Sequence, residues 1–406
     1  DLHLSLRRQR QMCIRDSLLF ALSVAAAGCA CAQGADSPPP LTPKAATPSN
    51  PMNAQALPQA TVIRRSLAPA LYELAYSDKQ KAVFVASAGG REKDAPQSRI
   101  LRLDPTTLAV VAEIPLKERG LGVALDDDGN RLYVGNAFDA AVTVIDTQTN
   151  GIVGTIRLAE KIHTTDFEGK PTERAPHNLR ELVLDKARHR LFAPGIWIED
   201  SALYVADTRS LQLEKVIPGF GFGAAGATVD EASGKLYVGN MQGQLFTIDT
   251  RSLALERQSE VAADQLLNLA FDKRQQRVLA VDQGGGNVDM VRRKFAKLAY
   301  QARGEGNRIV VIDPRDGQVE TRIPTGQGPV AVLIDEARHR LIVTNRGSGT
   351  VTVHSFDDYR LLYTLDLPSH PNSLALDRQT GAIFATVKNS DQDPKGSNES
   401  VVRIAF

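Results

Sequence analysis

The sequence predicts an all-β protein, a seven-bladed β-propeller of four-stranded blades that is closed by an N-terminal strand. Three observations lead to this prediction. Nearly the same heptapeptide occurs twice, as NRLYVGN at 130–136 and as GKLYVGN at 234–240. Apolar runs that end at Asp or Ser recur at intervals of about 40 to 60 residues, a repeat length typical of propeller blades. Each interval contains short β-type runs separated by turn residues, as a four-stranded blade requires.

The composition is that of an ordinary globular protein, with 406 residues, 42% hydrophobic and 23% charged. A formal net charge of +1 gives no general attraction to nucleic acid or membranes, so an electrostatic partner needs a local patch. The three cysteines, Cys13, Cys29 and Cys31, all lie near the start of the chain. We therefore expect no disulfide, thiolate metal ligand or cysteine nucleophile in the folded part.

The N-terminal residues predict export. In residues 1–32, several arginines precede the apolar run LLFALSVAAA (18–27), which is too short to span a bilayer, and small residues then fit a cleavage site. We read 1–32 as a signal peptide, with the first dozen residues an artefact of the gene start. Acylation of Cys29 is the alternative, so a soluble and a membrane-tethered periplasmic protein of a Gram-negative-type bacterium both stay open. Neither leaves a transmembrane segment in the mature chain.

Residues 33–59 contain seven prolines and almost no large apolar residue, which predicts a disordered linker. The propeller is expected to occupy residues 60–406. Each of its seven units has a first strand that ends at an anchor residue, and the anchors are Ser77, Asp126, Asp185, Asp230, Asp272, Asp335 and Asp377. The seventh unit runs out of chain after its third strand. We therefore expect ATVIRRSL (60–67) to supply the missing outer strand and remove an open edge.

Several stretches resemble one known family. YVGN and IVTN resemble the repeats of YVTN-type propellers, and LYELAYS (71–77), RELVLD (180–185), PSHPNSLALD (368–377) and the closing VVRIAF resemble its YncE-like periplasmic branch. The resemblance covers roughly residues 62–406. It implies an exported seven-bladed propeller, with nucleic-acid binding associated with the family and no established catalysis. The segment 284–307 has no obvious counterpart in that pattern.

The long insertions all fall at one end of the predicted ring. In a four-stranded meander, the connections from strand two to three and from strand four to the next blade share one face, which we call the mouth face. Its connections are long, at 89–98, 159–178, 284–307 and 388–398, whereas those of the opposite face are tight. Ligand sites commonly lie in such loops on a rigid scaffold, so the mouth face is the candidate binding surface.

The residues four positions before each anchor are expected to face the central channel, because strand residues alternate between two faces. They are small or polar: Glu73, Gly122, Glu181, Gly226, Asn268, Ala331 and Ser373. Oxygen ligands suit Ca²⁺ or Mg²⁺, so Glu73, Glu181 and Asn268 form a candidate metal site. The alternative is a hydrated channel with polar walls. Residues one position before each anchor are large and apolar, and we expect them to pack between blades.

Further ligand-binding candidates lie in the entry loops and in the blade-five insertion. Those of the entry loops are Arg119, Asn178, Gln265, His370 and Asn372. In 288–300, Arg292, Arg293, Lys294 and Lys297 surround an apolar helical face between glycine-rich ends. This pattern predicts either a mobile basic flap that grips a polyanion or an amphipathic helix docked on the ring. Trp197, the single tryptophan, is a candidate for stacking on a base or sugar, with plain packing as its alternative.

We therefore expect an exported, non-enzymatic propeller that binds single-stranded nucleic acid or another polyanion at its mouth. No residue is assigned a catalytic role, and catalysis stays open. One alternative is a metal-assisted hydrolase or lactonase with His370 as base. Another is a scaffold that binds a protein partner. GFGAAG (221–226) leads into a strand and not a helix, so it predicts no dinucleotide site, and His189 and His339 are expected to be turn residues.

Overall fold

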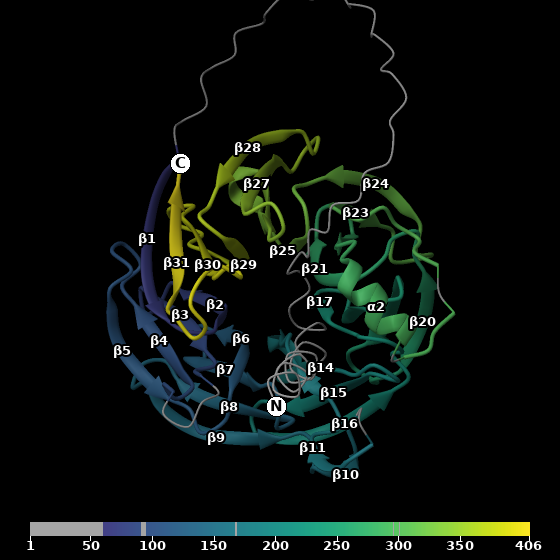
Figure 1. The fold of residues 1–406 in the computed structure, drawn as a ribbon. Helices are drawn as coiled ribbons and strands as arrows, with labels where there is room; N and C mark the ends of the chain where they lie inside the picture. The colour runs from purple at the N-terminus through teal and green to yellow at the C-terminus, as the bar shows by residue number, and fades with distance from the viewer. Residues whose placement is uncertain (1–59, 91–94, 167–168, 295, 300) are drawn as a thin grey trace, which may run out of the picture.

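The computed structural model describes residues 60–90, 95–166, 169–294, 296–299 and 301–406. The predicted signal peptide, Cys29 and the predicted linker at 33–59 lie outside these residues. Seven antiparallel sheets stand around a common axis like the blades of a propeller (Figure 1). The prediction of an all-β, seven-bladed propeller is confirmed.

Each blade is an antiparallel meander whose first strand lies nearest the axis and whose fourth strand forms the rim (Figure 1). Blade one contains β2 (Leu71–Ser77), β3 (Ala82–Ser87), β4 (Arg99–Leu103) and β5 (Val110–Pro115). Blade two contains β6 (Gly120–Asp126), β7 (Arg131–Asn136), β8 (Ala141–Asp146) and β9 (Gly151–Arg157). Blade three contains β12 (Asn178–Leu179) and β13 (Val183–Asp185), which together form its inner strand, then β14 (Arg190–Ile196), β15 (Ala202–Asp207) and β16 (Gln212–Pro218).

The remaining blades repeat this pattern. Blade four contains β17 (Gly226–Asp230), β18 (Lys235–Gly239), β19 (Gln244–Asp249) and β20 (Leu255–Glu260). Blade five contains β21 (Leu266–Asp272), β22 (Arg277–Asp282), β23 (Arg308–Ile312) and β24 (Val319–Pro324). Blade six contains β25 (Pro329–Asp335), β26 (Arg340–Asn345), β27 (Thr350–Ser355) and β28 (Leu361–Asp366). Blade seven contains β29 (His370–Leu376), β30 (Ile383–Lys388), β31 (Glu399–Ala405) and β1 (Thr61–Ala68).

The last blade joins the two ends of the described chain. Strand β1 pairs antiparallel with β31, from Thr61 opposite Ala405 to Ala68 opposite Glu399. The outer strand of blade seven therefore comes from the beginning of the propeller, as the missing fourth strand of the last repeat predicts. Its pairing covers the edge that β31 would otherwise expose.

The tight face is built by side chains that cap its turns. The side chains of the anchor residues accept hydrogen bonds from backbone N–H groups of the turn that follows. Asp185 accepts one from Arg188, for example, and Asp377 accepts one from Gln379. Each turn then ends in a residue with a left-handed backbone, at Lys81, Asn130, His189, Gly234, Gln276, His339 and Gly381. At the third-to-fourth-strand turns, backbone N–H groups lower the pKa of aspartates such as Asp104 and Asp146. His189 and His339 are therefore turn residues, as predicted.

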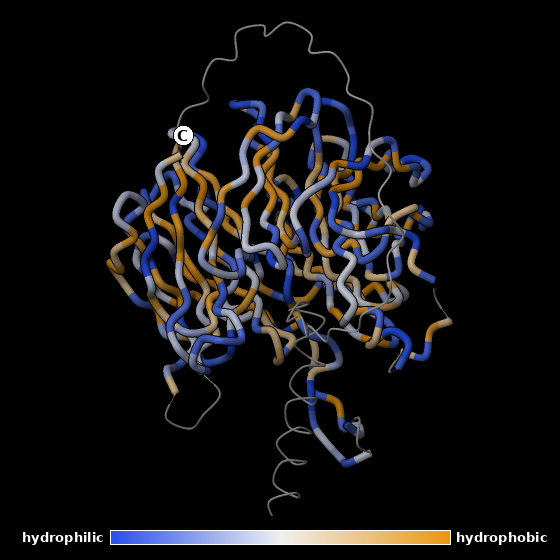
Figure 2. Tube along the Cα trace, turned by 45° about the horizontal axis from the view of Figure 1, so that its top comes forward, coloured by the Kyte–Doolittle hydropathy of each residue, from blue (hydrophilic) through white to orange (hydrophobic). Residues whose placement is uncertain are grey.

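The core consists of apolar layers between neighbouring blades. Tyr76 stacks on Phe384 across blades one and seven, with ring centroids 5.7 Å apart, and Tyr237 stacks on Phe271 across blades four and five at 5.5 Å. Hydrophobic residues accordingly fill the blades, and hydrophilic ones gather in the connecting loops (Figure 2). The prediction that residues one position before the anchors pack between blades is confirmed for Tyr76 and Phe271.

The long insertions follow second or fourth strands, so they share the mouth face as predicted. One contains the hairpin of β10 (Ile162–Thr165) and β11 (Pro171–Arg174), which lies at the periphery of the ring (Figure 1). Another contains α2 (Gly286–Lys294). Two short 3₁₀ helices, η1 (Lys186–Arg188) and η2 (Glu336–Arg338), belong to tight-face turns. Across the described residues, no helix combines the length and the hydrophobicity needed to cross a membrane.

Candidate ligand-binding site at the mouth of the ring

The inner strands are irregular near their mouth ends. In blades one, two, five, six and seven the pairing of the first two strands shifts register at the same place, for example between Leu71 and Leu74 in β2. In blade three the inner strand is interrupted there, between β12 and β13. A β-bulge changes the direction of side chains relative to strict alternation. Two consecutive residues of such a strand can therefore both approach the axis.

Neighbouring inner strands approach each other closely at this level. A Cβ atom on Gly122 would overlap the carbonyl oxygen of Arg180 in the next blade. A Cβ on Gly226 would lie 2.7 Å from the carbonyl oxygen of Leu267. The small residues predicted to face the channel are thus required by backbone contact between blades, and they leave room for the longer side chains of other blades.

The three residues of the predicted metal site lie close together. The Nδ2 of Asn268 lies 3.5 Å from Oε2 of Glu181, and Oε2 of Glu73 accepts the N–H of Val123 at 3.0 Å. The charge of Glu73 acts on Glu181, although the two come from blades one and three. The structure therefore brings these three polar side chains together.

Arg180 joins this cluster and adds a positive charge to it. Its Nη1 lies 3.7 Å from Oε2 of Glu181 and donates to the carbonyl oxygen of Leu267 at 3.2 Å, so it links blade three to blade five. Burial raises the pKa of Glu73 to about 7. Burial and the charge of Glu73 raise the pKa of Glu181 well above its usual value, while Arg180 opposes both shifts. Both carboxyl groups therefore bind protons at higher pH than an ordinary glutamate does, beside the cation Arg180.

This arrangement weighs against a cation. Arg180 already supplies positive charge beside the carboxyl groups. Within the described residues, no group of three or more His, Cys, Asp or Glu side chains is placed to hold a metal ion. Ca²⁺ or Mg²⁺ at Glu73, Glu181 and Asn268 stays a prediction, and a hydrolase that depends on it is not developed further.

A second cluster lies at the mouth ends of blades one, six and seven. Lys388 donates to Glu399 at 2.9 Å and to the carbonyl oxygen of Leu71 at 2.6 Å, and its Nζ lies 3.8 Å from the ring centroid of Tyr72. Burial lowers the pKa of Lys388, and Glu399 opposes this shift. Lys388 and Glu399 thus form a closed, buried ion pair.

Arg346 directly follows β26 and borders this second cluster. Burial lowers the pKa of its guanidinium, and Arg180 lowers it further. Two arginines from blades three and six are thus close enough to influence each other, which places both near the axis at the mouth.

The entry-loop candidates have mixed roles. His370 donates through Nδ1 to the carbonyl oxygen of Arg346 at 2.8 Å, so it borders the site. The side-chain amide of Gln265 is 2% exposed and exchanges two hydrogen bonds with the backbone of Gly285, so Gln265 holds the blade-five insertion and is not free to bind a ligand. Arg119 is half-buried and donates to the carbonyl oxygen of Gly89.

The two candidate asparagines contribute mainly through their backbones. Asn178 pairs with Ile196 in β14, and the buried Asn372 accepts the hydroxyl of Thr344 through its carbonyl oxygen at 2.8 Å. Ligand contact by their side chains stays a prediction.

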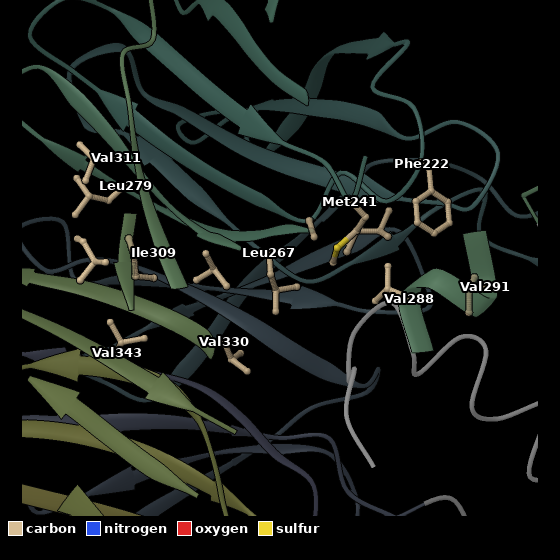
Figure 3. Close-up of a cluster of buried hydrophobic side chains, with 14 of the residues drawn as sticks. Phe222, Met241, Leu267, Leu279, Val288, Val291, Ile309, Val311, Val330 and Val343 are labelled. Carbon is tan, nitrogen blue, oxygen red and sulfur yellow. The ribbon is translucent and has the colours of Figure 1, made fainter. Parts of the chain in front are cut away.

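The blade-five insertion is docked on the ring, so of the two interpretations that the sequence left open, the structure supports the docked helix and not the mobile flap. Val288 and Val291 of α2 are fully buried and pack in one cluster with Phe222 and Met241 (Figure 3). Arg292 was expected to contact a ligand but is 0% exposed, so that expectation is wrong. The apolar face points inward, and Arg292 lies on it because it follows Val288 by four residues, about one helical turn.

Arg292 is held by three groups. It bonds to Asp264 at 3.0 Å, to the carbonyl oxygen of Met241 at 2.8 Å and to Asp289 at 3.1 Å. The other candidate cations of the insertion, Arg293, Lys294 and Lys297, are exposed. Arg293 also pairs with Asp289 at 3.1 Å.

Trp197 packs and does not offer a stacking platform. It is 8% exposed and belongs to the same buried cluster as α2. The guanidinium of Arg174 in β11 lies 3.5 Å from its ring centroid, which covers one ring face. The alternative that the sequence left open, plain packing, is the one that the structure supports.

Sequence reasoning missed Arg180 and Arg346. Strict alternation places Arg180 among the residues that pack between blades, where an arginine is unusual, and that anomaly was a usable signal. Arg346 directly follows IVTN (342–345), which looks like an ordinary turn. Its burial depends on blades six and seven together, so no local pattern could have found it.

Comparisons with known proteins agree with this architecture. The chain is 27% identical over 351 residues to the uncharacterized protein YncE of Salmonella typhimurium, covering 85% of this chain and 91% of that protein. The uncharacterized protein YncE of Escherichia coli is 28% identical over the same shares. Its homologues are the YncE proteins. No protein-family model matches the chain.

The YncE proteins found in these comparisons are bacterial, and their length is almost completely covered. A solved structure, the hydrazine synthase of Kuenenia stuttgartiensis, superposes with a TM-score of 0.60 at 15% identity, covering 78% of this chain and 92% of that one. At this identity the likeness concerns the fold alone. The family that the sequence resembled is therefore the one to which its homologues belong.

Proposed function

We propose that this YncE homologue is a non-enzymatic, ligand-binding propeller whose mouth receives an anionic ligand, with single-stranded nucleic acid or another polyanion as the leading candidate. The convergence of Arg180 and Arg346 from opposite sides of the ring carries this proposal. Burying two mutually repelling cations destabilises a fold unless an anion balances them. Glu73, whose pKa is about 7, and Glu181, whose pKa is raised by burial and by the charge of Glu73, balance these cations only in part near neutral pH.

Exposed cations on the mouth face support an extended ligand. Arg293, Lys294 and Lys297 lie at the end of α2 or just after it and are exposed to solvent. Such side chains attract a phosphate backbone without reading its sequence. A polyanion could thus lie across the mouth, while the buried arginines act on the group nearest the axis.

We also propose that the protein works in the periplasm. The support is the N-terminal sequence pattern and the bacterial origin of the homologues. Attachment through an acylated Cys29 and binding of a protein partner remain further proposals of the same kind. Fractionation of cells that express the native gene would test the location.

The binding proposal is tested with a fluorescently labelled single-stranded oligonucleotide and the purified full-length chain. We expect binding that weakens steeply between 50 and about 200 mM salt. The triple variant Arg293→Glu, Lys294→Glu, Lys297→Glu should weaken binding at least about tenfold and flatten the salt dependence. The matched control, Arg251→Glu, Lys273→Glu, Arg378→Glu, changes exposed cations of the tight face. It should bind like the wild type, and equal losses in both variants would contradict a mouth-face site.

A further inference from the structure

Arg346 is a buried cation without an acidic partner among the described residues. It is 6% exposed, and its Nε is buried without a hydrogen-bond acceptor. Its backbone is fixed on both sides, because its N–H donates to Gly328 at 2.9 Å and its carbonyl oxygen accepts from His370 at 2.8 Å. The side chain is therefore positioned, while its charge is not compensated at contact distance.

The two carboxylates whose charges act on Arg346, Glu399 and Asp391, form no ion pair with it among the described residues. Glu399 acts on Arg346 at longer range, but its Oε2 is bonded to Lys388 at 2.9 Å and to the N–H of Leu71 at 2.6 Å. Structural arginines that are buried are normally paired, because an unpaired charge in the interior destabilises the fold. A bound anion would supply the missing partner.

The direction of Arg346 follows from its long-range neighbours. Arg180 of blade three and Tyr72 of blade one both influence its charge, although Arg346 belongs to blade six. Only a side chain that points toward the axis can be near all of these blades. Only 6% of Arg346 is exposed, so a compact group is the ligand that suits it best.

We propose that Arg346 binds one terminal oxyanion group of the ligand, a phosphate monoester or a carboxylate, that enters the mouth along the axis. A guanidinium suits such a group, because its fork of donors matches two oxygens at once. This inference rests on the proposed anionic ligand. It adds that Arg346 binds the end of that ligand, whereas the rest of the ligand lies over the exposed cations of α2.

Thermal unfolding of the full-length chain tests the oxyanion site without any nucleic acid. At constant ionic strength, inorganic phosphate and acetate are titrated separately against chloride. A bound anion at tenfold excess over its Kd should raise Tm by about 2 °C. A rise in Tm with phosphate alone identifies the ligand group as a phosphate monoester. A rise in Tm with acetate alone, or with both anions, shows that the site accepts a carboxylate. No response to either anion overturns the proposal, whatever the variants do.

The variant Arg346→Met should abolish this response, while Arg251→Met, which removes an exposed arginine of the tight face, should keep it. Arg346→Met also relieves an unpaired buried charge, so we expect it to unfold at the same temperature as the anion-free wild type or higher. If it fails to fold, Arg346→Lys keeps the charge without the fork and should weaken the response. An unchanged response in either variant overturns the assignment to Arg346.

Paired oligonucleotides separate this inference from the proposed function. A 5′-phosphorylated strand should bind about tenfold more tightly than the same strand with a 5′-hydroxyl, and Arg346→Met should remove the difference. Equal binding of both strands, with no phosphate response, overturns end recognition and leaves the polyanion proposal intact. No binding of either strand, with an Arg346-dependent phosphate response, removes nucleic acid as the ligand and keeps the oxyanion site.

Discussion

Arg180 shows how a single residue sets the chemistry of the mouth. Glu73, Glu181 and Asn268 alone look like oxygen ligands for a cation, but Arg180 introduces a guanidinium 3.7 Å from Glu181. Burial raises the pKa of both carboxyl groups, so they bind protons at higher pH than ordinary glutamates do. This balance predicts an unusual pH dependence of stability.

We expect stability to fall as pH rises through neutrality because of Glu73. Its pKa is about 7 in the folded protein against an ordinary value of 4.5, so the folded state binds the extra proton between these values. The contribution of this extra proton to the free energy of unfolding is complete below pH 4.5 and is lost as pH rises through about 7. It amounts to at most about 3 kcal/mol. Urea unfolding of wild type and Glu73→Gln at pH 5 and pH 8 measures it.

The variant Glu73→Gln should gain stability relative to wild type as pH rises from 5 to 8. Removing this charge also lets Glu181 ionise more easily, because the two repel each other. Glu113→Gln, at an exposed carboxylate of β5, serves as control and should track the wild type. Parallel pH profiles for Glu73→Gln and wild type would refute the buried, proton-binding role of Glu73.

At the scale of elements, α2 is a fixed part of the ring. Its apolar residues Val288 and Val291 join the layer that contains Phe222 and Met241, and Arg292 bonds blade four and the connection before blade five. The glycines around the insertion therefore serve its close entry and exit and not a hinge. Gly284 and Gly306, for example, touch each other and both have positive φ.

Replacing Arg292 should destabilise the protein far more than replacing its neighbour. Arg292→Met leaves Asp264 buried without its cation, which costs about 3 kcal/mol. Arg293→Met removes an exposed pair with Asp289 and should cost less than about 0.5 kcal/mol. Chemical denaturation of both variants gives the comparison. Similar losses would show that α2 is not anchored through Arg292.

At the scale of the whole molecule, the ring depends on a contact between its ends. Strand β1 lies beside β31 over its whole length, although more than 300 residues separate partners such as Arg64 and Ser400. The ring therefore cannot close until the last blade is made. The cooperativity with which the ring unfolds should therefore depend on β1.

Deleting residues 60–68 should lower Tm by about 10 °C and cause association at higher concentration, because β31 becomes an open edge. Calorimetry and light scattering after size-exclusion chromatography measure the two effects. A deletion of 33–59 keeps β1 and provides the control. If both deletions unfold at the wild-type temperature without association, closure by β1 does not stabilise the ring.

The sequence by itself determined the repeat, the seven blades, the face that carries the insertions and the meeting of Glu73, Glu181 and Asn268. These features follow from local patterns: strand periodicity, turn-capping aspartates and loop length. Only the tertiary structure decided the roles of Arg180, Arg292 and Arg346. The bulges in the inner strands redirect side chains away from strict alternation, and Arg346 is buried where blades six and seven pack together in the folded ring. Whether a cation is exposed or buried depends on such packing, because the sequence gives the charge of a residue but not its exposure to solvent.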